Sequence, residues 1–171
     1  MVYNFPVVTA GIDLDSDTIA TLAQHPNIVG TKLSCGNVGK LHRLTSQTSA
    51  SEFAVFAGRS DVLLHGLLSR SAGGITALMN VVPKVHFSLY KAYEEGKLDE
   101  AMKLQSILGQ ADWAVQKLGG VGGVKAIVSH AFGYGSGAVR GPLRPADASV
   151  FKGNKYAELV FDLIENQEKR L

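Results

Sequence analysis

The fold of this 171-residue chain is most constrained by its alternation of short apolar runs with helical segments. Four runs have the length and composition of β-strands. They cover residues 1–5, 28–34, 53–57 and 73–77. Each is followed by a segment with apolar residues at helical spacing, and three of these segments have a Ser, Asp or Asn placed to cap the start. These segments begin near Asp15, Val38, Ser60 and Asn80, and the last accepts Pro83 in its first turn. The order predicts a parallel sheet covered by helices, because parallel strands need crossover connections.

The spacing of these units narrows the prediction to one kind of parallel sheet. The repeat of about 22–25 residues matches the rhythm of a TIM (β/α)8 barrel, which takes about 250 residues and eight βα units. Here we expect about four units over residues 1–96, followed by a helical region over 97–171, the two forming one continuous structural unit. The helical region should contain helices near 98–118, 121–132 and 148–168, with a Gly- and Pro-rich loop before the last.

Composition excludes several classes of protein. The chain is 46% hydrophobic and has a formal net charge of +2 with no long basic run, so we expect no nucleic-acid partner and no membrane-surface partner. No apolar run approaches the roughly 18 residues that a membrane-spanning helix needs. The first residues do not resemble a signal peptide, and the single cysteine, Cys35, cannot form an internal disulfide. We therefore expect an intracellular protein, cytoplasmic, or mitochondrial if a presequence precedes this sequence.

Lys32 is the unusual residue of the second predicted strand, because lysine rarely leaves water. Strand alternation places Gly30, Lys32 and Ser34 on one face, and Val29 and Leu33 on the face expected to pack against helices. Lys32 then points into the barrel near a strand's carboxyl end, where barrels build active sites. A desolvated amine there can attack a ketone and form a Schiff base. A lysine at a strand end can equally extend to water or pair with an acid.

Other motifs give weaker signals. The stretch from Ser34 to Leu41 lacks the first Gly and the final Ser/Thr of a phosphate-binding loop. No two histidines have metal-ligand spacing, and the alternating Asp13, Asp15 and Asp17 lack the Gly and Glu of a calcium loop, so helix capping is the better interpretation.

Five segments together resemble the dihydrodipicolinate synthase / N-acetylneuraminate lyase family of class I pyruvate aldolases. The segment Tyr3-Asn4-Phe5-Pro6 with Thr9-Ala10-Gly11 resembles the family's Y-N-x-P-x-x-T-G. The others are N-I-V-G-T-K at 27–32, F-A-G-R-S-D at 56–61, G-G-I-T at 73–76 and the helical end from 105 to 143. The resemblance runs almost end to end, covers the C-terminal half of the family's barrel, and is strongest to 4-hydroxy-2-oxoglutarate aldolases and fungal 2-keto-3-deoxy-sugar-acid aldolases.

The resemblance implies a role for four residues. Lys32 is the Schiff-base nucleophile, and Tyr3 is the phenol that relays a proton to and from the substrate oxygen. The backbone around Gly58 and Ile75 lines the pocket for the pyruvyl group. No metal and no cofactor are implied, because the protonated imine itself is the electron sink. Taken alone, Tyr3 is as well explained as a packed tyrosine and Gly58 as a tight turn.

Two departures from the family pattern shape the expected function. Val8 stands where synthase members carry a carboxylate-binding arginine, which argues against the lysine-biosynthesis reaction. Nothing corresponds to the family's first four βα units, which carry a Gly-Thr-Thr/Ser carboxylate-binding loop. We therefore expect a fragment or half of a split enzyme: an aldolase-type lyase with impaired activity on a pyruvate-derived 2-oxo acid, and a homo-oligomer. The alternatives are a synthase-type condensation of pyruvate with an aldehyde, and a non-catalytic homologue that only oligomerises.

Overall fold

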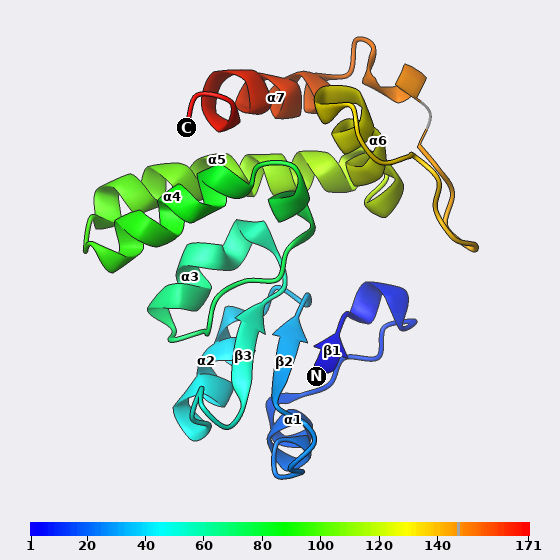
Figure 1. The fold of residues 1–171 in the computed structure, drawn as a ribbon. Helices are drawn as coiled ribbons and strands as arrows, with labels where there is room; N and C mark the ends of the chain where they lie inside the picture. Colours follow the sequence, from blue (N-terminus) through cyan, green and yellow to red (C-terminus); the bar gives the residue numbers. More distant parts are fainter. Residues whose placement is uncertain (147) are drawn as a thin grey trace. The chain divides into compact units, whose positions relative to one another are not determined.

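The computed structural model describes residues 1–146 and 148–171 (Figure 1). They form two compact units, Met1–Thr76 and Ala77–Leu171. The first unit contains the strands and the second is helical. The predicted division at residues 96 and 97 stays a prediction.

The first unit contains a parallel three-stranded sheet with the order β1-β2-β3. Its strands are β1 (Val2–Asn4), β2 (Gly30–Leu33) and β3 (Ala54–Ala57). The elements between and after them are η1 (Pro6–Val8), α1 (Ser16–Leu22), α2 (Val38–Gln47), η2 (Ser60–Val62) and α3 (Leu63–Leu68). Figure 1 shows the three strands side by side. The predicted α/β class and partial (β/α)8 barrel are confirmed.

Two helices of the sheet unit, α1 and α2, begin where a short polar side chain accepts a hydrogen bond from a backbone amide, whereas the N-cap residue of α3 makes no such bond within the described residues. The Asp15 carboxylate accepts a hydrogen bond from the Thr18 amide at 2.8 Å, and the Asn37 side chain accepts one from the Lys40 amide at 2.8 Å. These bonds satisfy amides that lack a partner in the first turn of a helix. The interpretation of Asp15 as a cap is confirmed.

One face of the sheet packs against α1 and α2. The core there joins Leu33 and Val55 of the sheet to Ile19 of α1 and Leu44 of α2, all buried. Since side chains alternate along a strand, Lys32 lies on the opposite face, as predicted. The expectation for Val29 was wrong: it is 59% exposed, because β2 begins only at Gly30 and the alternation does not extend back to it.

The predicted fourth strand is much shorter than expected. Only Gly74 forms a bridge, to Ala57, although the Ile75 amide also donates to the Ala57 carbonyl at 2.9 Å. Gly73 has φ of +133°, a conformation outside the strand region, and a 3-10 helix starts at Ala77. The pairing is therefore cut off on both sides.

The second unit consists of helices. They are η3 (Ala77–Asn80), α4 (Pro83–Glu94), α5 (Leu98–Lys117), α6 (Val121–Phe132), η4 (Ala148–Phe151), α7 (Lys155–Leu163) and the π-helical η5 (Ile164–Glu168). The long α5 packs against both α4 and α7. The helix expected over 148–168 is divided into three, with the cap residue Asn154 starting α7. No helix in the described part of the chain is long and apolar enough to cross a membrane.

The start of α4 is capped from a distant part of the chain. The prediction that Asn80 caps this helix was wrong, since its amide donates to the Ala77 carbonyl at 3.0 Å. Instead, the buried Glu168 carboxylate accepts hydrogen bonds from the Lys84 and Val85 amides, both at 3.0 Å. A carboxylate is favoured there because a helix N-terminus carries partial positive charge.

Candidate active site

Lys32 lies on the sheet face opposite α1 and α2, between two aromatic neighbours. The register pairs it with Tyr3 of β1 on one side and with Phe56 of β3 on the other. Its amine lies 4.3 Å from the centre of the Tyr3 ring, and the side chain is half-buried. Among the residues that the structure describes, Lys32 makes no ion pair. The ring face therefore provides the attraction for its charge.

The Tyr3 hydroxyl is held by a short chain of polar contacts. It lies 3.4 Å from the Ser34 hydroxyl oxygen, which lies 3.1 Å from the Gly58 carbonyl oxygen. A carbonyl can only accept, so Ser34 gives its single proton to Gly58 and remains able to accept one from Tyr3. Tyr3 is 49% exposed. The contacts with Ser34 and Gly58 orient its hydroxyl on the Lys32 side of the sheet.

Gly58 and Ile75 lie at the next strand ends along the sheet. The Gly58 amide donates to the Leu33 carbonyl at 2.9 Å, which joins the ends of β2 and β3. Ile75 is 38% exposed and follows the bridge at Gly74. The structure thus places Tyr3 next to Lys32, and Ser34 links Tyr3 to Gly58. In the part of the chain that the structure describes, Ile75 makes no polar contact with Lys32. Substrate-lining roles for Gly58 and Ile75 stay predictions.

Ser34 is the residue of this group to which the sequence interpretation gave no role. Its position two residues after Lys32 places it on the same strand face, and this was the available signal. The serine is only 5% exposed. Its contacts come from segments 31 and 24 positions away, which spacing along one strand cannot predict.

Arg59 is the one arginine close to this group in sequence, and it is already engaged. Its Nε donates to the Asp61 carboxylate at 3.2 Å, and a second guanidinium nitrogen contacts the other carboxylate oxygen. Val8 is 66% exposed. The position that holds an arginine in synthase members thus offers an apolar surface here.

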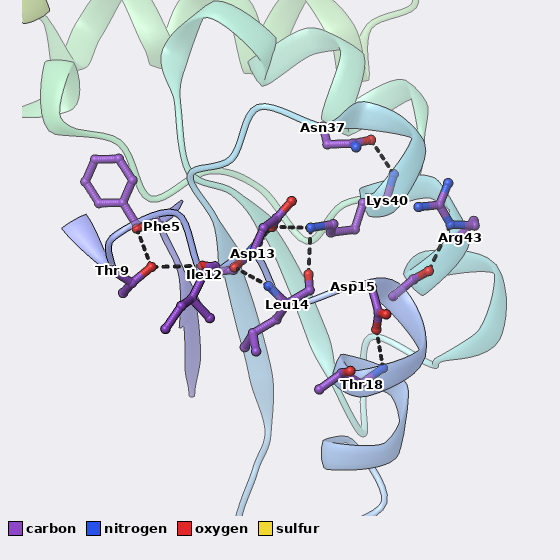
Figure 2. Close-up of polar contacts among 12 residues, drawn as sticks. Phe5, Thr9, Ile12, Asp13, Leu14, Asp15, Thr18, Asn37, Lys40 and Arg43 are labelled. Carbon is purple, nitrogen blue, oxygen red and sulfur yellow. Dashed lines mark hydrogen bonds and ion pairs between the residues drawn. The ribbon is translucent and has the colours of Figure 1, made fainter. Parts of the chain in front are cut away.

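A polar cluster formed by Asn4, Asp13 and Lys40 anchors the loop after β1. Figure 2 shows Lys40 beside Asp13 and Leu14. The buried Lys40 ammonium contacts the Asp13 carboxylate and donates to the Leu14 carbonyl at 2.6 Å. The Asn4 amide donates to Asp13 at 2.7 Å, and its oxygen accepts from the Leu14 amide at 3.0 Å. Asn4 directly follows Tyr3, so the cluster also fixes the end of the strand that carries the phenol.

Replacing Asp13 with asparagine should destabilise the protein in a pH-dependent way. Hydrogen bonds from Lys40 and Asn4 lower the pKa of the Asp13 carboxyl from its ordinary value of 3.8. A group with a lowered folded-state pKa stabilises the protein above that ordinary value, and this stabilisation is lost as the pH falls through the folded-state pKa. The Asp13 side chain is 45% exposed, so solvent screens its contacts, and we expect a loss of at most about 1 kcal/mol at pH 7 for Asp13→Asn, measured by urea denaturation.

The pH series separates this ion pair from general acid sensitivity. The gap between wild type and Asp13→Asn should begin to shrink as the pH falls below about 4, where the carboxyl of the unfolded state takes up a proton, and should close as the pH falls through the lowered pKa of the folded state. Asp17→Asn, at an exposed position in the first turn of α1, is the matched control and should change stability by under about 0.5 kcal/mol. A gap that stays constant from pH 7 to pH 3 would contradict the electrostatic role of Asp13.

A comparison with family models places the chain in a known group. The model of the dihydrodipicolinate synthetase family matches residues 1–156.

Curated relatives and solved structures agree with that match. The chain is 42% identical over 148 residues to a protein of Emericella nidulans named as a probable mitochondrial 4-hydroxy-2-oxoglutarate aldolase, covering 86% of this chain and 46% of that protein. It is 41% identical over 151 residues to the L-threo-3-deoxy-hexylosonate aldolase of Hypocrea jecorina, covering 84% of this chain and 47% of that protein. The chain spans about half the length of these relatives.

A solved structure of the same group gives the structural comparison. YagE, a prophage protein of the dihydrodipicolinic acid synthase family from E. coli K12, was solved in complex with pyruvate. It is 28% identical to this chain and superposes with a TM-score of 0.77, covering 97% of this chain and 55% of that one.

Proposed function

The chain belongs to the dihydrodipicolinate synthetase family, and on this premise we propose that it carries the Schiff-base chemistry of a class I aldolase, a carbon–carbon lyase. The observation that carries the proposal is the Lys32 amine 4.3 Å from the Tyr3 ring centre, with the Tyr3 hydroxyl oriented by Ser34. An amine and a phenol on one sheet face are the two groups that imine formation needs: a nucleophile and a proton donor.

The proposed reaction begins with attack of the unprotonated Lys32 amine on the ketone carbon of the substrate. Tyr3 gives its proton to the resulting hydroxyl, which leaves as water, so that a protonated imine and a phenolate remain. The phenolate then takes the proton of the substrate's 4-hydroxyl as the C3–C4 bond breaks. The electron pair of that bond moves into the imine to give an enamine, and an aldehyde leaves. Protonation of the enamine carbon and hydrolysis of the imine release pyruvate and restore the amine.

The Tyr3 ring has a second part in this proposal. The protonated imine is a cation at the place where the ammonium lies now, so the same ring face attracts it. The attraction is worth about 0.5–1 kcal/mol at an exposed site.

The proposed substrate is a 2-oxo acid derived from pyruvate, such as 4-hydroxy-2-oxoglutarate or a 2-keto-3-deoxy-sugar acid. The names of the Emericella nidulans and Hypocrea jecorina relatives support this class. Val8 weighs against the alternative, a synthase-type condensation of pyruvate with an aldehyde, because a valine cannot form a charge-assisted bond to a carboxylate. The 171 residues taken alone should turn over slowly, since positioning of reactants supplies up to about 7–11 kcal/mol of barrier reduction in complete sites.

The test is to incubate the chain with pyruvate, reduce with borohydride and weigh the protein. We expect the mass of one reduced pyruvyl group on Lys32, located by peptide mapping. Because imine formation precedes carbon–carbon cleavage, trapping detects the chemistry even where turnover is slow. Absence of any adduct would remove this function from the chain.

We also propose that the chain assembles into homo-oligomers in the cell interior, in the cytoplasm or in mitochondria. β1 is an edge strand, and the exposed apolar residues Val7, Val8 and Ile12 lie in the loop that follows it. Exposed edges and apolar surface favour association. Native mass spectrometry should therefore show a dimer or larger species, and a stable monomer at micromolar concentration would count against assembly.

A further inference from the structure

The helical unit contains a hollow of about 380 Å³ on one side of α6. Val121, Val124, Lys125 and Val128 line it from a single helix face, since they follow the i, i+3, i+4, i+7 pattern. Asn80 from η3, and Tyr134 and Ser136 from the segment after α6, also line the hollow. The hollow lies within the unit Ala77–Leu171 and shares no residue with the group around Lys32.

Among the described residues that line this hollow, Lys125 is the only one with a charged side chain. It is half-buried, and among the residues that the structure describes it makes no hydrogen bond or ion pair. The other polar lining groups can all donate protons: the Tyr134 and Ser136 hydroxyls and the Asn80 amide. Within residues 1–146 and 148–171, no aspartate or glutamate lines the hollow. A lining of a cation and further proton donors without an acid is suited to an anion.

The position of Lys125 in its helix adds to this preference. α6 begins at Val121, and its N-cap Gly120 provides no side chain to accept from the first amides. A helix N-terminus carries partial positive charge, so a lysine near it is disfavoured unless a negative group is close by. An anion in the hollow would offset both charges.

We propose that this hollow binds a small organic carboxylate. The carboxylate contacts Lys125 and the neighbouring hydroxyl groups, and the aliphatic body lies against the valines of α6. The volume is at the lower end of the roughly 300–1,000 Å³ typical of small-molecule pockets, which suits an acid of a few carbons. This proposal does not rest on imine formation at Lys32.

The test uses Lys32→Ala protein, so that no imine can form, and follows backbone amide chemical shifts by NMR during titration. The probes are butyrate, 2-oxobutyrate and, as the charge control, butylamine. We expect saturable shifts in residues 121–128 and 134–136 with both acids and none with butylamine. Lys125→Met should weaken butyrate binding at least about tenfold, because a charge-assisted bond is lost. Lys125→Arg should retain binding within a few-fold.

The matched control is Lys103→Met, which removes an exposed lysine from α5 and should leave butyrate binding unchanged. Two results would overturn the proposal: butyrate binding that is equal with and without Lys125→Met, or chemical shift changes with butylamine that equal those with butyrate. If Lys125→Met does not fold, two other results decide: the shifts caused by butyrate compared with those caused by butylamine on Lys32→Ala protein, and butyrate binding by Lys125→Arg. Loss of pyruvate trapping at Lys32 would leave this result unaffected, so the two proposals fail separately.

Discussion

Replacing Lys32 with alanine is expected to abolish borohydride trapping of pyruvate, and replacing it with arginine should abolish it equally. Alanine removes the nucleophile. Arginine keeps a positive charge near the Tyr3 ring, but its guanidinium stays protonated and cannot attack a ketone. The pair therefore separates the chemistry of the amine from its electrostatic contact with the ring, which the structure records at 4.3 Å. The measurement is the intact mass after reduction, with the labelled fraction expected to fall to background in both variants.

The control for these two variants replaces a lysine that has no tyrosine hydroxyl beside it. Lys103→Ala removes an exposed lysine of α5 and should trap pyruvate as fully as the wild type. Labelling of Lys32→Ala to the wild-type extent would show that pyruvate reacts with other amines. The far-UV circular dichroism spectrum of Lys32→Arg should match that of the wild type, which would show that the fold tolerates the substitution.

The parts of the fold that the sequence predicted are those set by neighbours along the chain. Asp15 lies three residues before the Thr18 amide that it accepts, and this local bond starts α1 where expected. Leu33 packs into the helix-covered core and Lys32 faces away, because alternation along a strand needs no knowledge of the rest of the chain. The resemblance to a known family added the roles of Lys32 and Tyr3, which periodicity alone left open.

The features that sequence reasoning missed are long-range polar contacts. Lys40 was considered only as part of a rejected phosphate loop, yet its ammonium contacts Asp13, 27 residues earlier. Glu168 caps α4 from more than 80 residues away, and local reasoning chose Asn80 instead. No spacing rule links such residues, because the fold that brings them together has to be known first.

Ser34 shows the same limit at the candidate site. Alternation indicated its face, but its contacts depend on how β1 and β3 align with β2. The register pairs Tyr3 with Lys32 and Lys32 with Phe56, which brings the Tyr3 hydroxyl and the Gly58 carbonyl to opposite sides of the serine hydroxyl. A shift of one residue in either pairing would separate them.

Replacing Gly58 with alanine should be among the most destabilising single changes in the sheet unit. A methyl group at this position would lie 2.6 Å from both the carbonyl carbon and the carbonyl oxygen of Leu33, and would collide with the Ser34 hydroxyl. The Leu33 backbone cannot move aside easily, because its carbonyl accepts the Gly58 amide at 2.9 Å. The methyl group must therefore force apart the carboxyl ends of β2 and β3. We expect a loss of about 3 kcal/mol in the free energy of unfolding.

Urea denaturation followed by circular dichroism measures this loss, and amide hydrogen exchange locates it. Exchange at the residue 58 amide should accelerate, since this amide donates to the Leu33 carbonyl that the methyl group pushes away. Gly109→Ala is the control: it places the same methyl group in α5, where no atom lies within 4 Å. That variant should gain about 0.5–1 kcal/mol, because alanine is the better helix former. A stability of Gly58→Ala equal to that of the wild type would mean that the strand ends can separate without cost. In that case, the hydrogen bonds that link Tyr3, Ser34 and Gly58 could not hold the phenol in place.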